Sequence, residues 1–238
     1  TRRSSDLGYG APTSSILSRV ELCFDIVEFG GEVDAVVKSM ADANGNLIIK
    51  SQSFSTSTVA LAAGTSGTQE LTFNQRVSSI KSIFTLFAPT STGGKKFSSK
   101  DITKSAGTYQ YFIGSEPYPP RPLDATNKSG MYMELCQAWS NAHSIEACNM
   151  SINRKEYHKV DGTADTSLVP GKFYVGANVE RLSSNTAILT GISSQLSPIS
   201  LRVNIPTATT DKHNATLVLC YDALIELNVI TRQVSVKS

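Results

Sequence analysis

Residues 199–205 read ISLRVNI, with an apolar side chain at every odd position and a polar one at every even position. Successive side chains of a β-strand point to opposite faces of the sheet, so this unbroken alternation predicts a strand with one buried face. The segment ATLVLCYDALIELNV, residues 215–229, follows after a short polar connection and is also strand-like. The last third of the chain is therefore predicted to be almost entirely β.

The rest of the chain adds further strands and two short helices. Strand patterns occupy residues 20–26, 47–61, 83–87, 109–113 and 172–182. Two segments have helical spacing instead. The first predicted helix carries Val33, Val36, Val37 and Met40 on one face and ends near Asn44-Gly45. The second carries Tyr132, Leu135, Cys136 and Trp139, with Ser129 as its candidate N-cap. Many strands with short helices in the connecting loops predict an all-β fold, an antiparallel two-sheet jelly-roll sandwich.

The domain organisation is expected to be simple. Residues 1–15 are predicted to form an N-terminal arm or linker, and residues 16–238 a single jelly-roll domain. The sequence begins with Thr1 rather than methionine, so a processed or partial chain is expected.

Four prolines follow the strand pattern at residues 109–113. The segment GSEPYPPRPL, residues 114–123, contains Pro117, Tyr118, Pro119, Pro120 and Pro122. Proline fixes φ and has no backbone N–H, so the segment is predicted to leave the sheet as an extended, polyproline-like arm. These five residues are predicted to form an interface arm that packs on a neighbouring domain. The alternative is a loop that folds back on its own domain.

Composition and cysteine spacing bear on the class of protein and on the compartment in which it assembles. Charged residues make up 18% of the chain and the net charge is +2, which argues against a dedicated nucleic-acid-binding protein. The loop lysines Lys95, Lys96, Lys100 and Lys104 either keep that loop solvated or attract an anionic partner. The cysteines, Cys23, Cys136, Cys148 and Cys220, form no C-x-x-C pair and are predicted to be buried thiols, which indicates assembly in a reducing compartment.

No motif for catalysis, metal binding or cofactor binding is present. The chain has no G-x-S-x-G elbow, and His143, His158 and His213 are isolated from one another. The loop DGTADTS, residues 161–167, carries two carboxylates but lacks the further ligands of a calcium site. No glycine-rich segment joins a strand to a helix as a phosphate-binding loop does. The sequence therefore predicts no enzyme, no catalytic residue, no metal, no cofactor and no small-molecule substrate.

Four segments, taken in order, carry a family resemblance. QELTFNQRVSSIKSIFTLF, with Arg76, Val77, Ile80, Lys81, Phe84 and Phe87, resembles a segment of the double-jelly-roll major capsid proteins of virophages, polinton-like viruses and adintoviruses. FIGSEPYPPRPL followed by YMELCQAW is similar to that family's proline arm and helix. The strand FYVGANVERL with Glu180, the turn Thr190-Gly191 and the closing strand with Tyr221-Asp222 also resemble it. The similar segments run from about residue 16 to the C-terminus and match the family's second, C-terminal jelly roll.

The resemblance implies a structural function. It implies a major capsid protein, present here as one jelly-roll half, that forms trimeric pseudo-hexagonal capsomers of an icosahedral shell. The implied partners are two further copies, neighbouring capsomers, penton, minor capsid or cement proteins, and the missing first jelly roll. The implied location is the virion, with assembly inside the host cell. Family chains carry two jelly rolls in tandem, whereas this sequence has strands for only one.

Two other functions stay open at the level of sequence. One is a minor or penton capsid protein with a single jelly roll. Such a protein is present in few copies at the vertices of a shell, whereas a major capsid protein is present in many copies on the faces. A secreted carbohydrate-binding β-sandwich differs in having disulfides and glycans.

Overall fold

Strands make up most of the computed structural model, which describes residues 31–42, 45–90, 99–142, 172–180, 190–231 and 233–237, with residues 152, 154 and 157. The strands are β1 (Asn46–Leu61), β2 (Gly67–Phe73), β3 (Ile80–Pro89), β4 (Thr108–Ile113), β5 (Glu116–Asp124), β6 (Tyr174–Asn178), β7 (Ile199–Ile205), β8 (His213–Asn228) and β9 (Gln233–Lys237). The helices are α1 (Gly31–Met40) and α2 (Lys128–Ala142).

The chain divides into two units, Thr1–Met40 and Ala41–Ser238. In the first unit α1 confirms the helix predicted from the spacing of valine and methionine, with Val36 and Met40 exposed. The predicted arm at residues 1–15 and the predicted strand at residues 20–26 lie outside the described residues. The boundary after residue 15 stays a prediction. Neither described helix is long and apolar enough to span a membrane.

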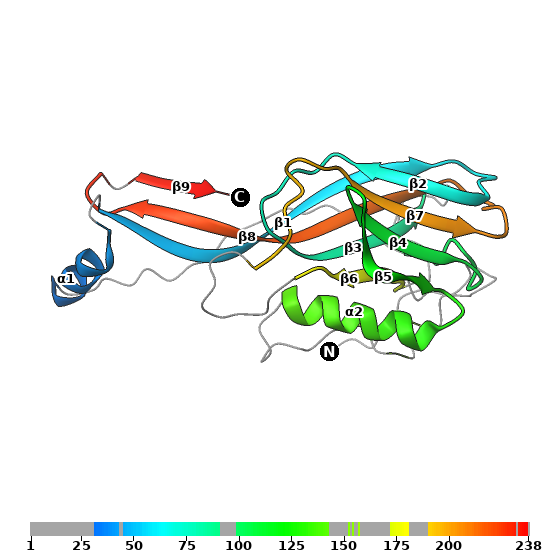
Figure 1. Ribbon diagram of the computed structural model, residues 1–238, viewed down its shortest axis with the longest axis horizontal. Coiled ribbons are helices and arrows are strands. Elements are labelled where there is room, and N and C mark those ends of the chain that lie inside the picture. The colour runs from blue at the N-terminus through cyan, green and yellow to red at the C-terminus, as the bar shows by residue number, and fades with distance from the viewer. Residues whose placement is uncertain are drawn as a thin grey trace, which may run out of the picture. The chain divides into compact units, whose positions relative to one another are not determined.

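The second unit is a jelly roll (Figure 1). One sheet has the strand order β1-β8-β3-β6, with β9 also paired to β8, and the other has the order β2-β7-β4-β5. Every pairing between these strands is antiparallel. Consecutive strands repeatedly cross from one sheet to the other, which is the arrangement of two interleaved Greek keys. The predicted jelly-roll sandwich is therefore confirmed.

Strand β7 shows how the alternation places the core. The apolar side chains at its odd positions have no exposed surface, and Leu201 lies between Leu71 of β2 and Tyr111 of β4. Ser200 departs from the expected pattern, because it is buried and its hydroxyl donates to Glu70 Oε1 at 2.9 Å. Arg202 follows the pattern on the outer face, where its guanidinium lies 4.5 Å from the ring centre of Phe112.

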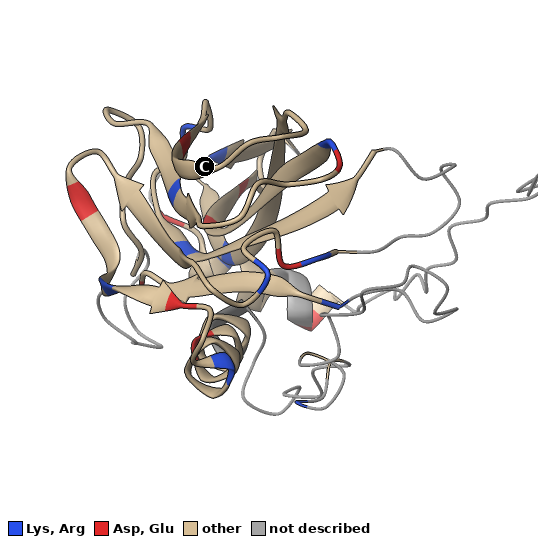
Figure 2. Ribbon diagram, turned by 90° about the vertical axis from the view of Figure 1, so that its right-hand side faces the viewer, with Lys and Arg blue, Asp and Glu red and all other residues tan. Residues whose placement is uncertain are grey.

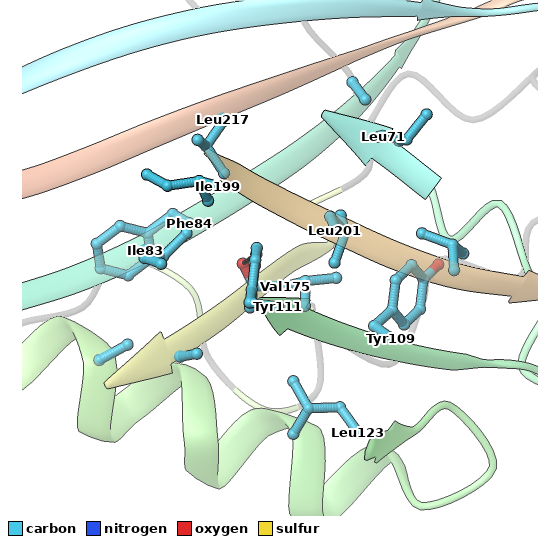
Figure 3. Close-up of a cluster of buried hydrophobic side chains, with 14 of the residues drawn as sticks. Leu71, Ile83, Phe84, Tyr109, Tyr111, Leu123, Val175, Ile199, Leu201 and Leu217 are labelled. Atoms are coloured by element: carbon cyan, nitrogen blue, oxygen red, sulfur yellow. Dashed lines mark hydrogen bonds between the residues drawn. The ribbon is translucent and has the colours of Figure 1, made fainter. Parts of the chain in front are cut away.

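The core fills the space between the two sheets. Figure 3 shows Leu217 of one sheet close to Ile199 of the other. Tyr111 of β4 crosses this space, and its hydroxyl contacts Thr85 Oγ1 at 2.9 Å and the carbonyl oxygen of Val175 at 3.0 Å. These contacts link the inner faces of opposite sheets, so a buried polar atom is hydrogen-bonded and the relative position of the sheets is fixed.

Stability is expected to fall above about pH 10 because three buried tyrosines, Tyr109, Tyr111 and Tyr157, resist ionisation. Burial raises the pKa of Tyr111 and of Tyr109, and the carboxylate of Asp101 raises the pKa of Tyr109 further. An unfolded tyrosine loses its proton near pH 10, so between that value and the raised folded pKa the unfolded state binds fewer protons and becomes favoured. Urea unfolding at pH 8 to 11 measures this loss. Tyr111→Phe is expected to cost about 1 kcal/mol at neutral pH and to flatten the alkaline decline.

Helix α2 covers the outer face of the β1-β8-β3-β6 sheet near β6 and confirms the second predicted helix. Leu135 is buried, and the ring of Trp139 meets that of Phe84 edge-on at 5.5 Å between centroids. The candidate N-cap Ser129 is wrong. The side chain of Asn127 caps the helix instead, accepting from the amide of Gly130 at 3.0 Å.

The prediction that the prolines leave the sheet is also wrong. The segment forms β5, which pairs with β4 so that Tyr118 lies opposite Tyr111 and Leu123 opposite Tyr109. The register shifts between these pairs, so residues 119–122 bulge past the single residue Gln110. Prolines are tolerated here because β5 is the edge of its sheet and its outer side needs no ladder donors.

Candidate functional site

A buried polar cluster connects segments that are far apart in the sequence. We call it the buried junction, and it consists of Ser79, Lys81, Glu180, Thr190, Gly191 and Asp222. It contains or adjoins most of the residues that carried the family resemblance in three of the four segments. Phe84 and Phe87 of the first segment lie farther along β3. Sequence reasoning named every junction residue except Ser79 from these motifs, and it did not predict that they meet.

A β-bulge places Lys81 in the junction. The β3–β8 register shifts between Ile80 and Ser82, so Lys81 is an extra residue on the bulged strand. Bulges of this kind redirect a side chain out of the regular alternation. Lys81 is 9% exposed, and its Nζ lies 3.4 Å from Oε1 of Glu180. The attraction between the two groups offsets part of the cost of burying either charge alone.

Asp222 is the acceptor at the centre of the junction. The residue lies on β8 with no exposed surface, and its Oδ2 accepts from Ser79 Oγ at 2.7 Å and from the backbone amide of Thr190 at 3.1 Å. Its Oδ1 lies 3.7 Å from Nζ of Lys50 on β1. One carboxylate therefore links three parts of the chain: strand β1, the start of β3 and the turn at residue 190.

The turn Thr190-Gly191 closes over the start of β3. The Thr190 hydroxyl donates to Glu180 Oε1, and the Gly191 amide donates to Ser79 Oγ at 2.9 Å. Ile80 and Ile192 exchange backbone hydrogen bonds of 2.7 and 2.9 Å. A Cβ atom at Gly191 would lie 2.2 Å from the carbonyl oxygen of Ile80, so this close approach of two backbones requires glycine.

The same contact continues beyond the turn. The Ser194 hydroxyl accepts from the Val77 amide at 3.1 Å, and the Ser194 amide donates to the Val77 carbonyl at 2.9 Å. Nη1 of Arg76 donates to the carbonyl oxygen of Gln195 at 2.6 Å. Residues 190–195 are thus held along residues 75–80 by both backbone and side-chain hydrogen bonds.

The chemistry of the junction is that of a structural link. Ser79 donates its proton to a carboxylate, and the nearby Cys220 thiol has its pKa raised by burial to about 11, so it stays protonated at neutral pH. His213, the one described histidine, lies at the other end of β8, where burial lowers its pKa. No group of three or more potential metal ligands occurs in the described ranges.

Cysteine and loop predictions can be checked in part. Cys220 is a buried free thiol and Cys136 is a free, half-buried one. Cys23, Cys148, His143, His158 and the carboxylate loop at residues 161–167 lie outside the described residues, as do Lys95 and Lys96. Figure 2 shows basic and acidic positions interspersed along the described ribbon rather than separated by sign.

The predicted interface arm lies on the surface of this single chain. Pro117, Tyr118 and Pro119 are half-buried, whereas Pro120 and Pro122 are exposed. A hollow of about 420 Å³ separates this strand from α2. Its lining includes Leu123, Asn127, Met131 and Glu134 besides the prolines. The edge presents apolar rings and few backbone donors, which disfavours the addition of another strand.

Comparisons with known proteins give matches only among solved structures. No family model matches the chain, and neither does any curated protein. A chain in the cryo-EM structure of the Sputnik virophage is similar with a TM-score of 0.39 and 11% identity, over 81% of this chain and 39% of that one. The crystal structure of the mavirus major capsid protein is similar with a TM-score of 0.39 and 9% identity, over 84% of this chain and 42% of that one. This chain thus spans about two fifths of the length of each.

Proposed function

We propose that this chain is a structural protein of a viral capsid and forms one jelly-roll half of a major capsid protein. The observation that carries the proposal is the buried junction. The residues Arg76, Val77, Ile80, Lys81, Glu180, Thr190-Gly191 and Tyr221-Asp222 were selected by their resemblance to the double-jelly-roll capsid family, and they lie in or beside this one cluster. Phe84 and Phe87 of the first segment, and the second segment with its proline arm and helix, lie elsewhere in the fold. The meeting of motif residues from three distant segments in one cluster supports the proposal.

The proposed role is mechanical rather than catalytic. Interlocked side chains between two sheets resist deformation because protein interiors pack at the density of organic crystals. The buried junction adds polar links that hold the connection before β7 against β3. A subunit of this kind keeps its shape while its edges contact other subunits, which is what a shell requires.

The proposed assembly is a trimer that occupies the faces of an icosahedral virion and is built inside the host cell. Its neighbours would be other trimers, penton, minor or cement proteins, and the first jelly roll carried on the same or another chain. Electron microscopy of the purified protein tests this proposal. Trimeric capsomers or icosahedral particles are the expected result. A monomer that forms no higher assembly, even with the first jelly roll present, would contradict the proposed assembly.

The interface arm is proposed to pack on a neighbouring jelly roll. The segment is already ordered as the edge strand β5, so it loses less conformational entropy on docking than a flexible segment would. Tyr118 supplies an aromatic ring with a polar end, a side chain that is favoured at interfaces.

Hydroxyl-radical footprinting of Tyr118 is expected to show several-fold slower oxidation in assembled material than in dissociated subunits. The physical reason is loss of solvent contact when the arm docks. Tyr111 is the matched control, because it is already buried in the single chain and its rate should not change. Equal oxidation of Tyr118 before and after assembly would exclude the arm from the interface and leave the capsid role intact.

A further inference from the structure

The buried junction involves two lysine–carboxylate pairs, and the pairs differ in their access to water. The side chains of Lys81 and Glu180 are 11% and 6% exposed. In the other pair the side chain of Asp222 has no exposed surface, whereas that of Lys50 is 33% exposed. In the Lys81–Glu180 pair, therefore, both the amine and the carboxyl group are nearly closed off from solvent.

The Lys81 amine and the Glu180 carboxyl group are in contact. Lys81 Nζ lies 3.4 Å from Glu180 Oε1, at the position to which the β-bulge of β3 directs the lysine. Burial disfavours charged groups, so transfer of one proton from the ammonium to the carboxylate, which leaves a neutral amine beside a neutral acid, is easier here than in water. A neutral lysine amine is a nucleophile, and the carbon of the acid is the electrophile that it attacks.

Thr190 supplies a hydrogen bond to the same carboxyl group. Its hydroxyl donates to Glu180 Oε1. Negative charge develops on a carbonyl oxygen when a nucleophile attacks its carbon, and a fixed donor at that oxygen stabilises the charge. Thr190 is itself held in place, because its backbone amide donates to Asp222 Oδ2 at 3.1 Å. The junction thus brings together a nucleophile, an electrophile and a donor to the oxygen that gains charge.

We propose that Lys81 and Glu180 become joined by an isopeptide bond, an amide between their side chains, once the chain has folded. Nζ of Lys81 bonds to Cδ of Glu180, and the bond from Cδ to Oε2 breaks. Oε2 leaves as one water molecule, with the proton that the acid carried and one proton from the amine. Oε1 stays as the amide oxygen and keeps the hydrogen bond from Thr190. The step consumes no oxidant and no second reactant.

The fold favours this condensation over the reverse reaction. Contact between well-oriented groups in one molecule corresponds to an effective concentration of about 10⁵–10⁸ M. The burial of both side chains keeps out the water that would hydrolyse the amide. The bond would close a loop of about 100 residues and so restrict the unfolded chain. This inference goes beyond the proposed capsid function and does not depend on it.

Intact-mass spectrometry of the denatured full chain tests the proposal. The chain is expected to be lighter than its sequence mass by one water molecule, about 18 Da. Trypsin does not cut after an acylated lysine, so the digest should contain a branched peptide that joins residues 77–95 to residues 173–181. A chain at its full sequence mass would overturn the proposal. A loss of water located in a linear peptide, such as one containing Asp161-Gly162, would overturn it too.

Two arginine variants assign the bond to one pair. Lys81→Arg keeps the positive charge, but a guanidinium stays protonated and is not a nucleophile, so this variant is expected at its full mass. Lys50→Arg is the matched control, since it changes the other pair, and it should still lose one water. The opposite pattern would contradict the assignment. The branched peptide of the unsubstituted chain decides the proposal even where a variant fails to fold.

Thr190→Val tests the hydrogen bond to the carboxyl group. The linked fraction is followed over time after a brief cell-free synthesis of each chain. The variant is expected to link about 100-fold more slowly than the unsubstituted chain, the loss typical of removing one such donor. Equal rates would remove Thr190 from the reaction. Capsomers assembled from chains at full sequence mass would rule out the bond and leave the capsid role standing.

Discussion

Replacing Asp222 with alanine is expected to lower the free energy of unfolding by about 3–5 kcal/mol, the range seen when one member of a buried charged group is removed. The carboxylate is fully buried and accepts from Ser79 Oγ and the Thr190 amide. Alanine leaves both donors without this acceptor and removes the carboxylate that lies 3.7 Å from Lys50. Urea unfolding should show a lower midpoint with an unchanged m-value.

Three further variants show whether the hydrogen bonds are the cause. Asp222→Asn keeps the shape and one carbonyl acceptor, so it is expected to cost less, about 1–3 kcal/mol. Glu116→Ala removes an exposed carboxylate and should change stability by less than about 0.5 kcal/mol. Ser79→Ala combined with Asp222→Ala should cost clearly less than the sum of the single variants, because the two residues share one hydrogen bond. Additive losses would mean that the junction does not act as a unit.

The parts of the fold that follow from local periodicity could be predicted from the sequence. The alternation in β7 and the helical spacing in α2 arise from burial of one face, and burial is encoded residue by residue. The N-cap of α2 was misplaced by two residues, because Asn127 and Ser129 are both favourable caps and only the backbone geometry distinguishes them.

The proline segment shows the limit of a local rule. Four prolines do exclude a central strand, and sequence alone cannot tell an edge strand from a detached arm. The difference depends on whether the segment pairs with β4, which is decided by the arrangement of the whole sheet. The extended backbone was predicted correctly, and its pairing with β4 was not.

The buried junction and the pairing of β1 with β8 depend on contacts between distant parts of the chain. Ser79 and Asp222 are separated by 143 positions, and no local pattern indicates that they meet. For the ends of β8 and β9 a signal was present, since residues 234 and 236 alternate with polar residues as 225 and 227 do. Only the register shows that these rows, together with Leu47 and Ile49, form one face. Local sequence patterns thus indicate which side chains are buried or exposed, whereas the topology of the sheets decides which distant residues meet.

Gly191→Ala is expected to be comparably destabilising, by about 3 kcal/mol or more, through overpacking rather than loss of a charge. The new Cβ would lie 2.2 Å from the carbonyl oxygen of Ile80 and 2.6 Å from the carbonyl carbon of Ser79. Both are backbone atoms, so no rotamer change can relieve the clash. The chain must separate at the Ile80–Ile192 pair, which breaks two backbone hydrogen bonds and moves the Gly191 amide away from Ser79.

Gly31→Ala is the matched control, because nothing lies within 4 Å of a Cβ at that position. Its midpoint of urea unfolding should match that of the unsubstituted chain, whereas that of Gly191→Ala should fall well below it. Amide hydrogen exchange locates the damage, since Ile80 and Ile192 should lose protection before the amides of β7 do. If Gly191→Ala were as stable as Gly31→Ala, residues 190–195 would not be held against the start of β3. The convergence of the family-like residues, which carries the proposed function, would then fail with it.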